Sequence, residues 1–91
     1  NYPNPFNPST TIQFELPVEA QVTLKVFNII GQEIATLADR RFGGGVHSVQ
    51  WNGLNKYNQN AASGIYIYRL IAVPANAKDR FIQTRKMMLL K

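Results

Sequence analysis

One long run of β-forming residues, residues 63–73, restricts the folds open to this chain more than any other feature of the sequence. Side chains alternate between the two faces of a β-strand, and both faces of this run are apolar except for Arg69. A strand with two apolar faces is covered on both sides, so the run predicts a central strand. Gly64 marks a sharp turn at the start of the run. We expect the other strands to pack around it.

Segments on either side of this run alternate apolar and polar residues, as strands with one buried face do. They are residues 11–16, 21–28, 32–37, 46–51 and 80–91. We expect the first two to form an antiparallel pair joined through residues 18–20, and residues 38–45 to form a loop. A short helix over residues 32–38 is the alternative for the third segment. The whole pattern predicts an all-β protein, an immunoglobulin-like antiparallel β-sandwich of about seven strands.

The inward faces of these strands predict the core. Trp51 is expected to be its largest side chain, because burial of an indole ring removes roughly 150–250 Å² from water. Tyr66 and Tyr68 share one face of the central strand with two apolar residues, so we expect this face to lie inward, beneath the indole. The opposite face would then expose an apolar patch, a feature that often marks a contact site. The patch consists of Ile65, Ile67 and Ile71.

The chain is predicted to be one domain, residues 1–91, because its length supports a single core. Three prolines and three asparagines in residues 1–10 predict an extended lead-in, and residues 11–91 hold the sandwich. There is no cysteine to form a disulfide. The sequence starts at Asn1 without a leader, so we expect it to be part of a longer protein. Its apolar runs are far shorter than the roughly 20 residues of a membrane helix, which argues against direct membrane insertion.

Positive charge is concentrated at the C-terminal end. Residues 1–68 are formally neutral, and residues 69–91 carry the whole net charge of +5. A basic C-terminal third either favours an anionic partner or serves solubility. Proteins that bind single-stranded nucleic acid combine basic grooves with exposed aromatic rings. Tyr66 and Tyr68 instead share a face with apolar residues, so we predict no nucleic-acid partner.

The sequence offers few groups for catalysis or metal binding. His47 is the one histidine, and Ser48 beside it would point to the opposite face of a strand, so the two cannot form a nucleophile–base pair. A single histidine without cysteine makes a poor metal site. The asparagine-rich loop at residues 52–60 has no carboxylate for calcium. We predict no enzymatic activity, no cofactor, no metal and a structural role for His47.

Five blocks of sequence, in order, carry a family resemblance. They are residues 1–12, residues 22–28 with Gly31 and Gln32, residues 45–53, residues 62–70 and residues 84–91. The blocks resemble the type A C-terminal sorting domain of the type IX secretion system (the Por secretion sorting domain) of Bacteroidetes and related phyla. They are also similar to the immunoglobulin-like domain of the flagellar hook-capping protein. Asn58 departs from the usual glycine, and asparagine tolerates the left-handed conformation that glycine adopts.

This resemblance implies a C-terminal secretion signal for an upstream cargo protein. The type IX outer-membrane translocon would recognise the domain in the periplasm and deliver the cargo to the cell surface or the medium, and a sortase-like peptidase usually removes the signal. Carried over by position, the recognition residues in the central strand would be Gly64 and Tyr66, and Gly31 is a weaker candidate. Those in the last block would be Lys86, Met87, Leu89, Leu90 and Lys91.

The residues themselves leave two other functions open. The domain could be an adhesion or spacer module, or a carbohydrate-binding module appended to a secreted hydrolase. Sugar-binding sandwiches present aromatic rings at loop tips or on an open face. The aromatic residues expected in loops are Tyr2, Phe6, Phe42 and Tyr57.

Overall fold

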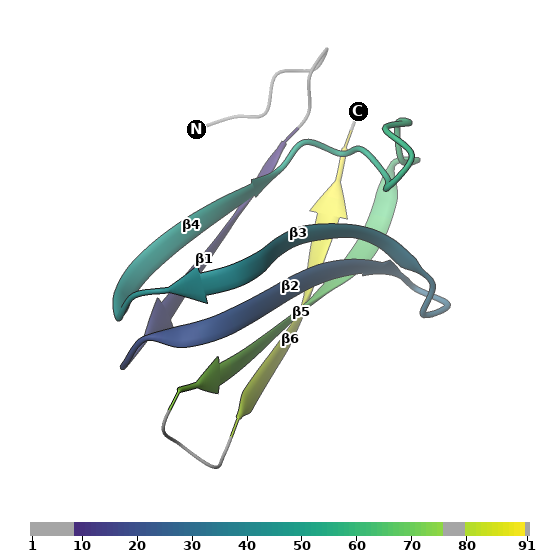
Figure 1. Cartoon of the computed structure of the whole chain (residues 1–91). Helices are drawn as coiled ribbons and strands as arrows, with labels where there is room; N and C mark the ends of the chain where they lie inside the picture. The colour runs from purple at the N-terminus through teal and green to yellow at the C-terminus, as the bar shows by residue number, and fades with distance from the viewer. Residues whose placement is uncertain (1–8, 76–79, 91) are drawn as a thin grey trace.

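A computed structural model of the chain describes residues 9–75 and 80–90 (Figure 1). The described part holds six strands and no helix, so the predicted all-β class is confirmed with six strands instead of about seven. The strands are β1 (Thr10–Leu16), β2 (Ala20–Asn28), β3 (Glu33–Phe42), β4 (Gly45–Trp51), β5 (Gly64–Pro74) and β6 (Phe81–Leu89). Between β4 and β5 the chain forms only an isolated bridge between Leu54 and Asn60, because Asn55 folds this segment into a turn by accepting hydrogen bonds from the backbone N–H groups of Tyr57 and Gln59.

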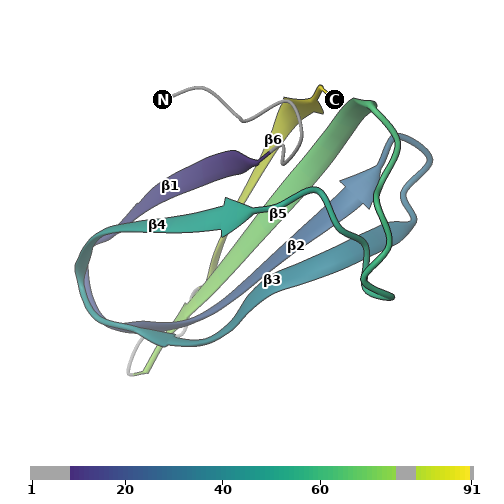
Figure 2. The same ribbon diagram turned by 90° about the horizontal axis from the view of Figure 1, so that it is seen from above.

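The strands form two antiparallel sheets in a sandwich-like arrangement (Figures 1 and 2). The larger sheet has the order β3-β2-β5-β6, and the smaller sheet consists of β1 and β4. β5 pairs with β2 on one side and with β6 on the other, which confirms the central strand predicted from residues 63–73. β6 is therefore an edge strand of the larger sheet.

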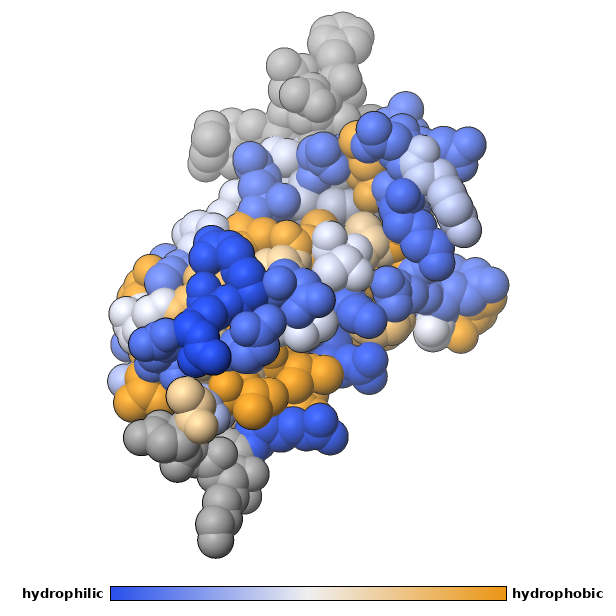
Figure 3. Space-filling model, in the orientation of Figure 1, coloured by the Kyte–Doolittle hydropathy of each residue, from blue (hydrophilic) through white to orange (hydrophobic). Residues whose placement is uncertain are grey.

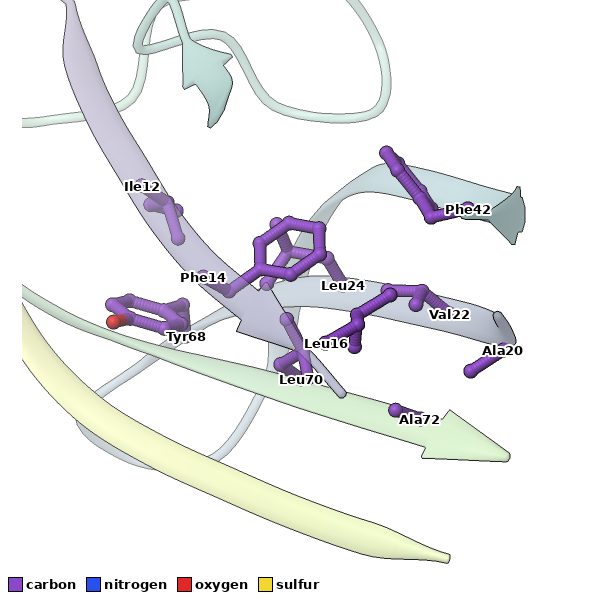
Figure 4. Packing of buried hydrophobic residues seen from close by; sticks show 10 residues of the cluster. All are labelled: Ile12, Phe14, Leu16, Ala20, Val22, Leu24, Phe42, Tyr68, Leu70 and Ala72. Atoms are coloured by element: carbon purple, nitrogen blue, oxygen red, sulfur yellow. The ribbon is translucent and has the colours of Figure 1, made fainter. Parts of the chain in front are cut away.

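The predicted pairing of the first two strands is wrong. β1 pairs with β4, with Ile12 opposite Val49, whereas β2 pairs with β3 and β5. A hairpin would have placed β1 and β2 side by side, with their apolar faces on the same side of one sheet. Instead, residues 17–19 carry the chain from one layer to the other, so that the apolar side chains of β1 meet those of β2 and β5 across the core (Figure 4).

The loop predicted over residues 38–45 is also wrong for most of its length. β3 continues to Phe42, and only two residues connect it to β4. The register of β2 and β3 shifts between Leu24 and Lys25, so the alternation seen in the first half of β3 does not continue into the second half. Phe42 is buried, and the guanidinium of Arg40 lies 3.8 Å from the centre of its ring.

Two clusters of buried residues make up the core. The first consists of residues from β1, β2 and β5, with Phe42 from β3 (Figure 4). The second is built around Trp51, whose ring lies 5.0 Å from that of Tyr66 in an edge-to-face arrangement. Trp51 and both tyrosines of β5 are buried, as predicted. The indole N–H of Trp51 donates to the carbonyl oxygen of Leu54 (2.9 Å), so its burial leaves no polar atom unpaired.

Candidate functional site

Two of the predicted recognition segments, distant in the sequence, are paired partners in the fold. Gly64 lies opposite Leu89, and Tyr66 lies opposite Met87. These pairs occupy the end of the β5–β6 ladder where β5 begins and β6 finishes (Figure 1). We call the group Gly64, Tyr66, Lys86, Met87, Leu89 and Leu90 the β5–β6 end. Lys91, the last predicted recognition residue, lies outside the described residues.

The side chains of the β5–β6 end divide into a buried and an exposed set. Tyr66 is buried, and its hydroxyl donates to the carbonyl oxygen of Ala62 (2.7 Å). Leu89 is 1% exposed and packs in the same cluster as Trp51. Leu90, in contrast, is 64% exposed. The buried members therefore fix the position of the strand ends, and only the exposed members can touch a partner.

The exposed set includes a residue that the sequence analysis missed. Met88 is 57% exposed and shares a strand face with Lys86, which is also exposed. The alternation of β6 was the available signal: Leu89 points inward, so Met88 must point outward. Met87, half-buried, packs against the core from the inner face.

Phe81, at the start of β6, is 37% exposed, although its position opposite the buried Ala72 places it on the inner face of the sheet. The smaller sheet has two strands, whereas the larger sheet has four. The buried residues of the smaller sheet pack against β2, β3 and β5 of the larger sheet. The inner face of β6 is thus covered only near Leu89. Hydrophobic residues are exposed between hydrophilic ones elsewhere too, as the face in Figure 3 illustrates.

The two candidate glycines lie in different parts of the fold. Gly64 has a φ of +156°, and a methyl group added there would meet open space, so the backbone conformation is what requires glycine. Gly31 has a φ of +88° and lies in the β2–β3 turn, where its N–H donates to the carbonyl oxygen of Asn28 (3.0 Å). Gly31 does not join the β5–β6 end; it lines a pocket with Ile67 and Arg69 of β5.

Most acidic groups near the larger sheet already have a cationic or polar partner. Lys25 and Glu33 form an ion pair at 3.2 Å, and Arg41 lies 3.6 Å from Glu19. The hydrogen bond from Lys25, and after it the one from Thr36, lowers the pKa of Glu33 below its ordinary value. Within residues 9–75 and 80–90, the cations of β5 and β6 therefore have no ion-pair partner.

The fold described above agrees with a match between the sequence and a family model. The model of the FlgD Ig-like domain matches residues 4–76. The chain belongs to the FlgD Ig-like domain family. No curated protein matches the chain. The immunoglobulin-like part of the resemblance is thereby confirmed, and the sorting-domain part stays a prediction.

The match divides the β5–β6 end of this FlgD Ig-like domain in two. Gly64 and Tyr66 fall inside the matched residues, together with Gly31. β6 lies beyond the match, so Lys86 and Leu90 belong to a C-terminal segment that the match does not cover. The match therefore covers β1 to β5, and it leaves the basic edge strand β6 outside.

His47 of this FlgD Ig-like domain has a structural environment. Its Nε2 donates to the carbonyl oxygen of Gly43 (2.6 Å), and its ring lies 5.0 Å from that of Phe42. Ser48 is exposed on the other face of β4. Within the described residues, no three His, Cys, Asp or Glu side chains gather where they could hold a metal ion. This part of the chain also contains no helix with the length and hydropathy needed to cross a bilayer.

Proposed function

We propose that this domain is a C-terminal sorting signal, which the type IX outer-membrane translocon recognises in order to carry an upstream cargo protein from the periplasm to the cell surface or the medium. The observation that supports the proposal best is the register of β5 and β6. It joins the two blocks of the sorting-domain resemblance, around Gly64 and around Leu89, into one local surface. A sortase-like peptidase would act after translocation.

Recognition would use the edge and the outward side chains of β6. An edge strand presents unpaired backbone N–H and C=O groups, to which another strand can add. Arg85 and Lys86 in the middle of β6 oppose pairing between two copies, because an antiparallel β6–β6 pair would bring like charges together. A translocon strand with acidic residues would meet no such repulsion. In this mechanism Tyr66 and Leu89 hold the edge in place, and Lys86 and Leu90 contact the receptor.

The test is the location of a folded reporter protein fused ahead of the domain, in a host that has the translocon. Lys86→Ala combined with Lys91→Ala should leave the domain folded and the reporter in the periplasm. The matched control, Lys56→Ala with Arg80→Ala, removes the same charge away from the β5–β6 end and should be exported normally. Normal export of the first double variant would refute the proposal.

Point substitutions are a better test than deletion of residues 86–91. Deletion removes Leu89 together with the exposed residues, so loss of export would also follow from unfolding. A spacer module would tolerate the exposed substitutions without any change in export. Resistance of each variant to trypsin, measured on the periplasmic fraction, shows whether the domain is folded.

The carbohydrate-binding alternative finds less support. Of the four aromatic residues expected in loops, Phe42 is buried in β3, and Tyr2 and Phe6 lie outside the described residues. Tyr57, at 71% exposure, is the one that the described structure presents to solvent. Retention of the domain on insoluble polysaccharide, lost in Tyr57→Ala, would favour this alternative over the sorting signal.

A further inference from the structure

The outer face of the larger sheet, turned away from β1 and β4, combines apolar and cationic side chains. Ile65 is 47% exposed there, and Ile67 and Ile71 are half-buried, so the apolar patch predicted from the sequence is present in part. Ile67 is shielded because Phe27 of β2 lies directly across from it.

Four successive rows cross this face at β5 and β6, each two residues from the next. The rows pair Ile65 with Met88, Ile67 with Lys86, Arg69 with Thr84, and Ile71 with Ile82. The outer two rows are apolar and the inner two each carry one cation. Side chains on one face of a strand repeat every second residue, so the cations lie about 7 Å apart along the strands.

The side chain of Arg69 is positioned so that it can bind an anionic ligand. Its guanidinium lies 4.7 Å from the centre of the Phe27 ring, a contact that orients the group without using its N–H donors. Thr84 lies beside it and lines the same pocket, as do Phe27 and Ile67. Lys86 lines a second pocket with Ile65 and Met88.

The two cations lack counter-charges in the part of the chain that the structure describes. Lys25, the register partner of Arg69 on β2, is paired with Glu33 at 3.2 Å. Among the residues that the structure describes, Arg69 and Lys86 form no ion pair. A second copy of this chain would bring the same cations onto them, so the charge of this face disfavours self-association.

We propose that this outer face binds an extended segment of another protein in which aliphatic, acidic, acidic and aliphatic side chains occur at every second residue. The two carboxylates would pair with Lys86 and Arg69, and the aliphatic side chains would pack on the two apolar rows. Strands of two sheets that pack face to face run within about 30° of each other, so the period of such a segment matches the rows. This inference shares Lys86 with the sorting proposal, but it concerns the face formed by β5 and β6, and its test measures peptide binding, not export.

A designed peptide tests the pairing of charges. The 91-residue chain, labelled with ¹⁵N, is titrated with acetyl-Leu-Ser-Glu-Ser-Glu-Ser-Leu-amide and with the same peptide carrying Gln in place of both Glu residues. We expect saturable shifts at the amides of Ile67 and Thr84 and at Nε of Arg69. The Gln peptide should bind at least fivefold more weakly. Equal binding of both peptides, or no saturable shift, would overturn the proposal.

Two variants of equal charge separate this face from general attraction to a basic protein. Arg69→Gln should weaken the Glu peptide at least fivefold, whereas Arg85→Gln should change its affinity less than twofold. Arg85 is on the adjacent strand but lies opposite Tyr68, on the inner face. Equal losses in the two variants would contradict a specific site.

Two further measurements decide between occupants of the face. Sedimentation should show a monomer, and phosphatidylglycerol vesicles should bind Arg69→Gln and the unchanged chain equally. Self-association that Arg69→Gln abolishes would assign the face to a second copy and overturn the proposal. Vesicle binding that only the unchanged chain shows, without peptide binding, would assign it to anionic lipid and overturn it likewise.

Discussion

Leu89→Ala and Leu90→Ala are adjacent changes of identical chemistry, but we expect only the first to lower the stability of the fold markedly. Leu89 is 1% exposed and packs with Trp51 and Tyr66, while Leu90 is 64% exposed. The Leu89 change removes three buried carbon atoms, worth about 2.4 kcal/mol at roughly 0.8 kcal/mol each. A cavity term adds to this, and partial relaxation at the strand end limits it, so we expect a loss of roughly 2.5–3.5 kcal/mol. Leu90→Ala should stay within about 0.5 kcal/mol of the unchanged chain.

Urea unfolding followed by tryptophan fluorescence measures both losses. Trp51 is the single tryptophan and lies 5.0 Å from Tyr66, so its emission reports on the cluster that contains Leu89. With a slope of about 1–2 kcal/mol per M, the urea midpoint of Leu89→Ala should fall by about 1.3–3.5 M. The melting temperature should fall by roughly 10–25 °C. A loss below 1 kcal/mol for Leu89→Ala, or equal losses for both variants, would refute the packing argument.

The remaining predictions concern a turn and an ion pair. Asn58 has a φ of +66°, so Asn58→Val should destabilise the chain by about 1–2 kcal/mol, and Asn58→Gly should be nearly neutral in the same urea assay; equal losses would mean that this conformation is not required. Because its pKa is lowered, Glu33 stabilises the fold at pH values above the pKa it has in the unfolded chain, and this contribution is lost as the pH falls through the folded pKa. An NMR titration should place its midpoint below the ordinary value and nearer to it in Lys25→Gln, whereas an ordinary midpoint in the unchanged chain would contradict the ion pair.

Local alternation of residues was enough to predict most strands and the direction in which their side chains point. The two apolar faces of residues 63–73 identified the central strand, and Trp51 and Tyr66 meet in the core as predicted. Strand pairing was not predictable in the same way. Whether β1 lies beside β2 or across the core from it depends on which layers exist, and that is decided by contacts distant in the sequence.

The extent of β3 was missed because of a backbone irregularity that leaves no mark in the residue pattern. The register shift next to Lys25 changes the phase of alternation, so residues 38–42 read as a loop. For the candidate site, the sequence resemblance supplied the residues but not their exposure. Leu89 and Leu90 are equivalent in that resemblance, and only the fold separates a packing residue from one that can touch a partner.

The pairing of Gly64 with Leu89 has a consequence for any receptor that reads both segments. The two residues are close only after β6 has paired with β5. This pairing brings Gly64, about two-thirds of the way along the chain, next to Leu89 near its end. An unfolded polypeptide contains the same residues but does not bring the two segments together. Such a receptor would therefore distinguish folded from unfolded chains in addition to recognising the sequence, and it would not bind chains that had not finished folding.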